Sequence, residues 1–242
     1  SLSVVGLVEV VAHIPRIYGE FRKLKQAITE RKPDIAILTD SPDFHLRLLP
    51  HLRKSNVPVA YLVAPQVWAW RRGRLKTLRH AVDKLLCIFP FEEEFFRRHR
   101  VDASYIGHPL AQTIRPSVDR ETFRRAHNVP KGQPLVAILP GSRVGEASRH
   151  LPVLAETVER LKAERNLTSI AGTPPGFSKR TPVNFWERFP AGTIQVLEGN
   201  TWDLLASSDL ALAASGTVTV EAALLGCPMI TYYRVTPASW TM

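Results

Sequence analysis

The stretch ALAASGTVTVEAALLGCPMI at residues 211–230 decides the fold of this chain. An apolar run ends at Ser215-Gly216-Thr217, and apolar residues at helical spacing follow at once. Gly226 and Pro228 close the predicted helix, and a further apolar run follows at 229–233. The stretch therefore predicts a strand, a tight turn of small residues, a helix and a second strand, which is the repeating unit of a parallel α/β sheet.

The turn between that strand and helix is a candidate anion site. Backbone amides and the positive end of a helix would converge there, an arrangement that binds phosphate. Glu221 lies one turn into the helix, where a carboxylate can accept hydrogen bonds from the hydroxyls of a ribose. Ser215, Gly216, Thr217 and Glu221 are therefore predicted to bind a nucleotide. An ordinary turn with a surface glutamate fits the same short pattern.

Short apolar runs recur along the chain and alternate with helical patterns. Most are continuous and do not alternate with polar residues, which is typical of parallel strands buried on both faces. The predicted strands are 34–38, 57–63, 84–89, 103–106, 135–139, 168–171, 194–197, 210–213 and 229–233. The predicted helices include 17–31, 44–54, 92–100, 120–127 and 149–164. The stretch 172–192 looks irregular against the helix expected there.

These elements predict two Rossmann-like, doubly wound α/β domains. Three prolines and a short charged helix in 108–131 mark the joint, so we expect one domain at 1–115 and another at 116–242. Ligands of paired α/β domains bind beyond the carboxyl ends of the strands, and we expect a cleft there.

A second phosphate-type signal opens the second domain. Gly141, Ser142 and Arg143 follow the strand 135–139 directly, with Glu146 shortly after. Gly141 permits close backbone approach, and the Arg143 guanidinium matches phosphate oxygens. We predict that Gly141, Ser142 and Arg143 bind the nucleotide. The alternative is a strand–helix loop with an exposed arginine.

In the first domain, Asp43 is the candidate catalytic base. It follows the strand 34–38 in the run Thr39-Asp40-Ser41-Pro42-Asp43-Phe44. A partly buried carboxylate beside Asp40 could take the proton of a sugar hydroxyl. Asp43 or Ser41 could instead cap the helix that follows.

A third group of candidates lies on the acceptor and lipid side. Two tryptophans two residues apart are not both expected in the core of a helix, and the cationic run 71–79 follows them. Apolar rings beside cations suit a membrane surface, although packing of both rings fits as well. His108, after a predicted strand, could contact substrate or fill the domain joint. The candidates on this side are Gln66, Trp68, Trp70, Arg71, Arg72 and His108.

Composition limits the remaining classes. The chain has 242 residues, of which 45% are hydrophobic, and no apolar run is long enough for a membrane span. The net charge of +10 fits nucleic acid, anionic lipid or a phosphorylated substrate, but no recognisable nucleic-acid module accompanies it. The spacing of Cys and His predicts no zinc site, and neither a metal nor a cofactor is expected. Cys87 and Cys227 are predicted to be buried free thiols.

Taken together, several ordered segments resemble the lipid-A-disaccharide synthase family of Gram-negative bacteria. They are SVVGLVEV at 3–10, DSPDF at 40–44, APQVWAWR at 64–71, FPFEEEFF at 89–96, YIGHPL at 105–110, LPGSRVGE at 139–146, ASGTVTVEAALLGCPM at 214–229 and YYRVTPASW at 232–240. The resemblance implies the B-type fold of nucleotide-sugar glycosyltransferases, with Asp43 at the general base, Arg143 at an arginine important for activity, and Ser215–Thr217 with Glu221 at the UDP site.

The resemblance also implies the reaction and its surroundings. The family transfers 2,3-diacylglucosamine from UDP to the 6-hydroxyl of 2,3-diacylglucosamine 1-phosphate, with inversion in the mechanism expected here. The implied partners are these two substrates, the inner-membrane surface on its cytoplasmic side, and a second copy in the full-length protein; nucleic acid is not expected. Family members have segments before and after the matched part, so we expect a fragment truncated at both termini. The alternatives are another UDP-sugar transferase or epimerase of this fold, a noncatalytic UDP-binding fragment, or a basic nucleic-acid-binding module.

Overall fold

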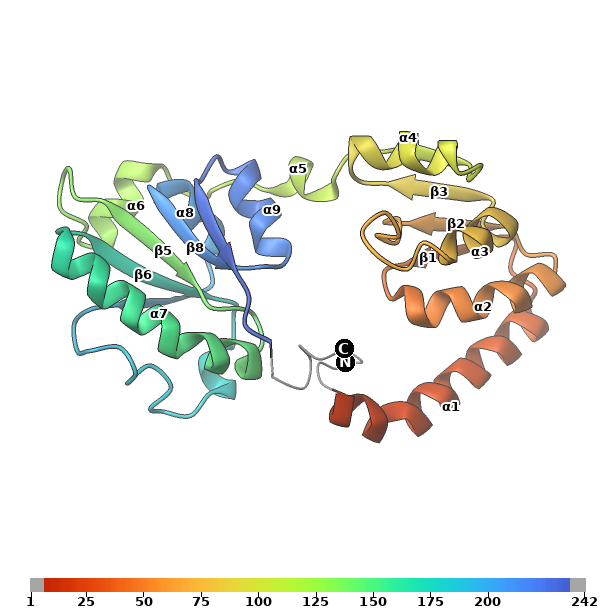
Figure 1. Ribbon diagram of the computed structural model, residues 1–242, viewed down its shortest axis with the longest axis horizontal. Helices are drawn as coiled ribbons and strands as arrows, with labels where there is room; N and C mark the ends of the chain where they lie inside the picture. Colours follow the sequence, from red (N-terminus) through yellow and green to blue (C-terminus); the bar gives the residue numbers. More distant parts are fainter. Residues whose placement is uncertain (1–6, 236–242) are drawn as a thin grey trace. The chain divides into compact units, whose positions relative to one another are not determined.

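The computed structural model describes residues 7–235, with side chains from residue 15 onward. The segments 3–10 and 232–240, which carry part of the family resemblance, therefore lie partly outside the described residues. The chain forms two compact units, one ending at Pro109 and one beginning at Leu110 (Figure 1). Each unit has its own parallel sheet and its own helices.

The first unit contains a four-stranded parallel sheet in the order β1-β2-β3-β4. Helices alternate with the strands along the chain. The elements are α1 (Leu7–Arg31), β1 (Ala36–Thr39), α2 (Pro42–Lys54), β2 (Val59–Leu62), α3 (Arg74–Ala81), β3 (Lys84–Cys87), α4 (Pro90–Arg98) and β4 (Ala103–Tyr105). Since consecutive strands are neighbours, the polar loops that follow β1 and β2 lie side by side at one edge of the sheet.

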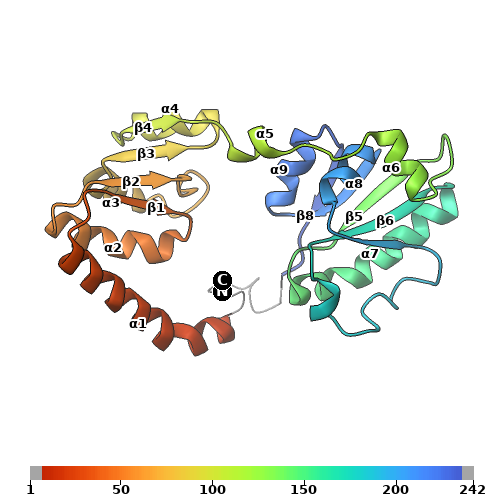
Figure 2. The same cartoon turned by 180° about the vertical axis from the view of Figure 1, so that it is seen from behind.

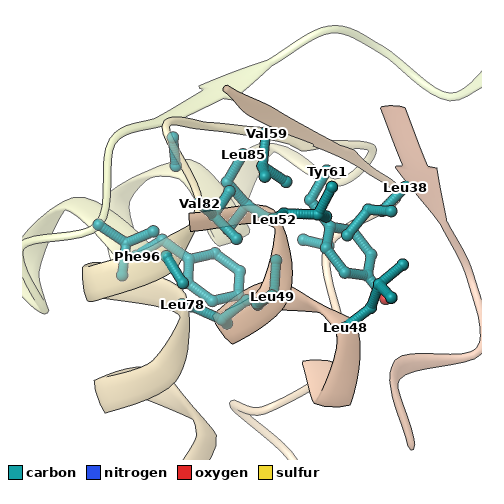
Figure 3. Close-up of a cluster of buried hydrophobic side chains, with 14 of the residues drawn as sticks. Leu38, Leu48, Leu49, Leu52, Val59, Tyr61, Leu78, Val82, Leu85 and Phe96 are labelled. Atoms are coloured by element: carbon teal, nitrogen blue, oxygen red, sulfur yellow. The ribbon is translucent and has the colours of Figure 1, made fainter. Parts of the chain in front are cut away.

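One face of the first sheet carries the core of this unit. Side chains from the strands and the helices meet there in a single cluster, as Figure 3 shows for Tyr61 and Leu85 with Leu49, Leu78 and Phe96. All five are fully buried. On β2 and β3 buried residues alternate with partly exposed ones, and Ile37 on β1 is 66% exposed. The continuous apolar runs predicted burial on both faces, and this does not hold for the first sheet.

The second unit contains a five-stranded parallel sheet in the order β7-β6-β5-β8-β9. The strands are β5 (Leu135–Leu139), β6 (Thr168–Thr173), β7 (Gln195–Glu198), β8 (Leu210–Ala214) and β9 (Met229–Tyr232). The helices are α5 (Pro109–Thr113), α6 (Arg120–Ala126), α7 (Val144–Glu164), α8 (Thr201–Ser207) and α9 (Thr217–Leu224), with a 3-10 turn η1 (Ser178–Arg180). The chain starts at the centre with β5, runs outward to β7, and returns to β8, which is the doubly wound order of nucleotide-binding sheets.

Both faces of the second sheet are covered. Helix α7 lies on one face and α6, α8 and α9 on the other, as Figures 1 and 2 show from opposite sides. On β5, Val136 and Ile138 belong to the cluster under α7, whereas Leu135, Ala137 and Leu139 belong to the opposite cluster. Every residue of β5 is buried, as its uninterrupted apolar sequence predicts.

The predicted elements are present, and some of their ends differ from the prediction by several residues. All nine predicted strands are present, and β5 has the predicted bounds. Helix α1 begins ten residues before the predicted start at 17, and α7 begins five residues before 149. The short helices α5 and α8 were not predicted. Their few residues carry too little periodicity to be recognised.

The stretch 172–192 is anchored by aromatic residues and by one acidic side chain. Phe177, Phe185 and Phe189 are buried in the cluster under α7. Glu198, the last residue of β7, accepts hydrogen bonds from the backbone amides of Gly176 and Ser178. These contacts account for an ordered segment that contains little regular structure.

The division between the units lies before the predicted boundary at 115/116. Ile114 is buried, and Ser117 donates from its amide and its hydroxyl to the buried carboxylate of Asp203 in α8. These contacts attach the segment after Pro109 to the second unit.

Candidate functional site

A cavity of about 330 Å³ opens in the second unit at the carboxyl ends of β5 and β8. These adjacent strands are where the strand order reverses, the position at which doubly wound sheets bind ligands. All seven predicted nucleotide-binding residues line it. They are Gly141, Ser142, Arg143, Ser215, Gly216, Thr217 and Glu221. The structure thus brings together, around one cavity, residues up to 80 positions apart in the sequence.

The loop after β5 forms one wall of the cavity. Gly141 has φ +118, and a Cβ there would lie 2.5 Å from Oε2 of Glu146. The backbone conformation therefore favours glycine at this position, and any larger residue would also displace the Glu146 side chain. Arg143 is the N-cap residue of α7 and its side chain is exposed, while the buried Glu146 also lines the cavity. A guanidinium and a helix N-terminus stand at this wall.

The loop after β8 forms the opposite wall. Gly216 is the N-cap of α9, and no side chain caps that helix. Its φ of 166 is extended backbone that other residues also adopt, so Gly216 differs from Gly141 in having no conformational requirement for glycine. Two helices, α7 and α9, begin at the cavity, and their first turns direct backbone N–H groups to it.

Glu221 is held by a tryptophan that the sequence did not reveal. Its Oε2 accepts a hydrogen bond of 3.1 Å from Nε1 of Trp202 in α8. Glu221 lines both the first cavity and an adjoining one of about 390 Å³, which also contains Trp202 and Asn200. No local pattern predicts this pair, because it depends on the packing of α8 beside α9. Glu221 therefore presents a fixed carboxylate at the boundary of the two cavities.

The partly buried Tyr232 and the buried His150 secure the loop after β5. The hydroxyl of Tyr232 donates to the carbonyl of Leu139, and burial raises the pKa of that hydroxyl. His150 contacts the carbonyl of Pro140 through Nδ1 at 2.7 Å, while its Nε2 accepts from the amide of Arg234 at 3.1 Å. This pattern assigns the proton of His150 to Nδ1. The cavity wall is thus fixed from β9 and α7.

In the first unit, the loop after β1 is strained. Asp40 and Ser41 both have left-handed backbone, with φ of 53 and 39, and Val63 after β2 has φ 62. Such conformations are uncommon outside glycine and concentrate at functional sites. The carbonyl of Asp40 accepts hydrogen bonds from the Tyr61 hydroxyl at 2.7 Å and from His45. Burial raises the pKa of Tyr61, so that it remains a donor.

Asp43 is not a helix cap. Ser41 is the N-cap residue of α2 and makes no side-chain cap, while Asp43 lies in the first turn. The carboxylate of Asp43 is directed to two arginines: Oδ1 accepts from Nη1 of Arg71 at 2.6 Å and from Nη2 of Arg74. The alternative in which Asp43 caps α2 is therefore wrong, because its carboxylate is engaged by Arg71 and Arg74.

The two tryptophans have different environments. Trp68 packs edge-on against Phe91 and donates from Nε1 to the buried Glu92 at 3.0 Å. Trp70 is 52% exposed, and its ring lies 4.6 Å from the guanidinium carbon of Arg71 and 5.6 Å from that of Arg74. Trp68 is thus a packing residue, whereas Trp70 belongs to the Asp43 group.

Three acceptor-side candidates remain. Gln66 and Arg72 are exposed on the same loop, and the ring of His108 lies 5.7 Å from that of Phe89 at the end of the unit. Arg74 was not singled out from the sequence. Its spacing from Arg71, one helical turn, is the signal that relates the two.

Other features bear on the chemistry available. Cys87 and Cys227 are buried free thiols, as predicted, and burial raises the pKa of Cys87 to about 12. Among the described residues, no group of three or more His, Cys, Asp and Glu side chains is placed to hold a metal ion. No helix within the same residues has the length and apolarity needed to cross a membrane.

Comparison with known sequences decides the family. The whole chain, residues 1–242, matches the family described as lipid-A-disaccharide synthetase. The chain belongs to this family. It is 58% identical over 240 residues to a lipid-A-disaccharide synthase of Solibacter usitatus, covering 99% of this chain and 62% of the relative. It is 44% identical over 237 residues to that of Myxococcus xanthus, covering 97% and 61%. The chain thus spans about three fifths of the length of these family members.

Solved structures support the fold class. The chain is similar to a Staphylococcus aureus MnaA structure solved with UDP, with a TM-score of 0.65 at 12% identity, covering 97% of this chain and 66% of that one. It is also similar to the UDP-GlcNAc 2-epimerase of Methanocaldococcus jannaschii, with a TM-score of 0.57 at 17% identity, covering 99% and 70%. Two parallel α/β units, as in the B-type fold of nucleotide-sugar enzymes, confirm the predicted fold class.

Proposed function

We propose that the complete protein containing this chain transfers a 2,3-diacylglucosamine unit from UDP to the 6-hydroxyl of 2,3-diacylglucosamine 1-phosphate. The products would be a β-1,6-linked disaccharide 1-phosphate and UDP. The observation that carries this proposal is the cavity at the carboxyl ends of β5 and β8, in a chain whose full length matches the family.

The second unit supplies the donor site in this proposal. The diphosphate lies against the N-termini of α7 and α9, where backbone N–H groups and Arg143 offset its charge. Glu221, oriented by Trp202, accepts hydrogen bonds from the ribose hydroxyls. As UDP leaves, Arg143 and the helix ends stabilise the negative charge that develops on its phosphate oxygen.

The first unit supplies the base. The Asp43 carboxylate removes the proton of the 6-hydroxyl while the hydroxyl oxygen attacks the anomeric carbon of the donor from the side opposite UDP. One carbon–oxygen bond forms as the bond to UDP breaks, so the configuration inverts. The protonated Asp43 then returns its proton to solvent.

The surroundings of the reaction follow from its substrates. Both carry acyl chains, so we propose that the protein works at the cytoplasmic surface of the inner membrane. Trp70 and the cations of α3 are the features of the first unit suited to an anionic lipid surface. We also propose that the full-length protein forms a homodimer.

The direct test is an assay of the complete protein with UDP-2,3-diacylglucosamine and the monosaccharide 1-phosphate. The expected result is stoichiometric UDP and a disaccharide with one phosphate, identified by mass and by its β-1,6 linkage. Epimerised UDP-sugar without disaccharide would indicate an epimerase instead. UDP binding without any product would indicate a binding protein.

A further inference from the structure

The Asp43 carboxylate is already occupied. Its Oδ1 accepts from Arg71 and from Arg74, and two guanidinium groups on one carboxylate leave a net positive charge. The Asp43 side chain is 62% exposed and that of Arg71 is 52%, whereas that of Arg74 is 16%. The Arg74 side chain is therefore mostly buried, whereas those of Asp43 and Arg71 are open to solvent.

This arrangement restricts Asp43 as a base. The two guanidinium groups occupy Oδ1 and fix the orientation of the carboxylate, so that Oδ2 is the oxygen left to accept a hydrogen bond from a substrate hydroxyl. Departure of the arginines frees Oδ1 and lets the carboxylate turn toward the hydroxyl. Exposed ion pairs are weak, so a competing anion can displace the carboxylate.

The arginines remain localised when they leave. The Trp70 ring lies within 4.6 Å of the Arg71 guanidinium and 5.6 Å of that of Arg74, and attracts both cations. The planar guanidinium fork matches the oxygens of a phosphate, and a phosphomonoester carries more charge than a carboxylate. The group can thus exchange one anion for another without unfolding the loop.

We propose that Arg71, Arg74 and Trp70 form a site for the phosphomonoester of the acceptor, and that phosphate binding there releases Asp43. This proposal rests on the proposed function, and it adds a control step to the same site. In a hexose 1-phosphate, the carbon that carries the phosphate and the carbon that carries the 6-hydroxymethyl group both flank the ring oxygen. Neighbouring protein groups can therefore contact both at once, with the arginines on the phosphate and the carboxylate on the hydroxyl.

The exchange has a chemical benefit. A carboxylate that is free in the absence of acceptor would activate water as readily as a sugar hydroxyl, and the donor would be hydrolysed. With the arginines on Oδ1 of Asp43, the carboxylate becomes fully available when the acceptor phosphate is bound. The acceptor would then control the reactivity of the site through its own charge.

The test measures binding of glucosamine 1-phosphate to the complete protein by calorimetry, without donor or turnover. If Asp43 competes with phosphate, D43N tightens binding by about threefold to tenfold, because the internal anion is removed. R74Q and R71Q each weaken binding by about tenfold or more. The matched control is D102N: Asp102 is 61% exposed, pairs with Lys84, and its replacement changes the net charge equally. The affinity of D102N for glucosamine 1-phosphate should stay within about twofold of the wild-type value.

The sign of the D43N effect decides the proposal. Affinity that is equal to or weaker than that of D102N would overturn it, because Asp43 would then be holding the arginines in place for phosphate. Absence of detectable phosphate binding by the wild type would also overturn it. Because no transfer is measured, a protein that binds as expected but forms no disaccharide would refute the proposed function alone.

A kinetic comparison gives a second readout. The acceptor without its 1-phosphate should lose turnover mainly in kcat, because Asp43 stays paired, and the loss should be smaller in R74Q. A loss confined to KM would mean that the phosphate serves only for binding, and would contradict the proposal.

Discussion

The candidate sites of the two units consist of different structural features. In the second unit, a sheet covered on both faces supports a cavity lined by a loop that contains a positive-φ glycine and by two helix N-termini. In the first unit, a sheet with one buried core carries an exposed group of opposite charges on strained loops. We expect the cavity of the second unit to be preformed, because packed clusters support it on both faces of the sheet. We expect the partly exposed ion pairs of the first unit to exchange partners. The proposed nucleotide site needs the former property, and the proposed base needs the latter.

The largest expected effect is on the free energy of unfolding, and it compares one residue from each sheet. Ile138 in β5 is fully buried and Ile37 in β1 is 66% exposed. We expect I138A to lower the free energy of unfolding by about 2–5 kcal/mol, and I37A to change it by no more than about 0.5 kcal/mol. Urea denaturation of both variants measures the difference. Equal losses would mean that the open face of the first sheet is covered in solution.

The next effect concerns the backbone of the cavity. G141A places a Cβ against Glu146 and forces a left-handed conformation on alanine. We expect UDP affinity to fall by at least about tenfold, since each effect alone costs on the order of 1 kcal/mol. The control is G132A, where φ is +80 but no atom lies within 4 Å of the new Cβ. Unchanged UDP affinity in G141A would show that the loop adapts and the cavity is not rigid.

A smaller effect is expected from the residue that orients Glu221. W202F retains an aromatic ring but removes the N–H that donates to Glu221. UDP affinity should fall by about twofold to tenfold, the value of one hydrogen bond to a charged group that stays partly solvated. UDP lacking both ribose hydroxyls should bind the variant and the wild type equally well. If it does not, Trp202 acts on something other than the ribose contact.

The smallest effect is a pH dependence within the second unit. Burial opposes the charge of Asp209, but hydrogen bonds from the Leu135 amide, Arg124 and Arg120 outweigh it and lower its pKa. A pKa lower in the folded state stabilises the protein above the ordinary aspartate value near 3.9, and this contribution is lost as the pH falls below it. Between pH 5 and pH 3, D209N should therefore lose less stability than the wild type. If the urea midpoints of D209N and the wild type fall equally between pH 5 and pH 3, this prediction is wrong.

The sequence predicted the second unit more fully than the first. Continuous apolar runs located every strand, and small residues after β5 and β8 identified both walls of the cavity. These signals are local, because a strand followed at once by a helix needs a tight turn. The contact between Trp202 and Glu221 is not local, since it arises only when α8 packs beside α9.

In the first unit, the sequence identified Asp43 and Arg71 but not the relation between them. Their pairing depends on left-handed backbone at Asp40, Ser41 and Arg71, which no side chain there makes obvious. The apolar run of β1 likewise predicted burial that Ile37 does not have, because apolar sequence alone does not say which face a helix covers. Sequence patterns therefore do not determine the backbone conformation of these few loop residues.

Donor binding is proposed for the second unit and proton removal for the first, and the most direct measurement follows both in a single variant. In the complete protein, D43N should lose turnover by a factor on the order of 10²–10⁴ with both substrates saturating, while its UDP affinity stays at the wild-type value. Turnover near the wild-type rate would remove Asp43 as the base. An equal loss of UDP binding and turnover would contradict the division of roles between the units.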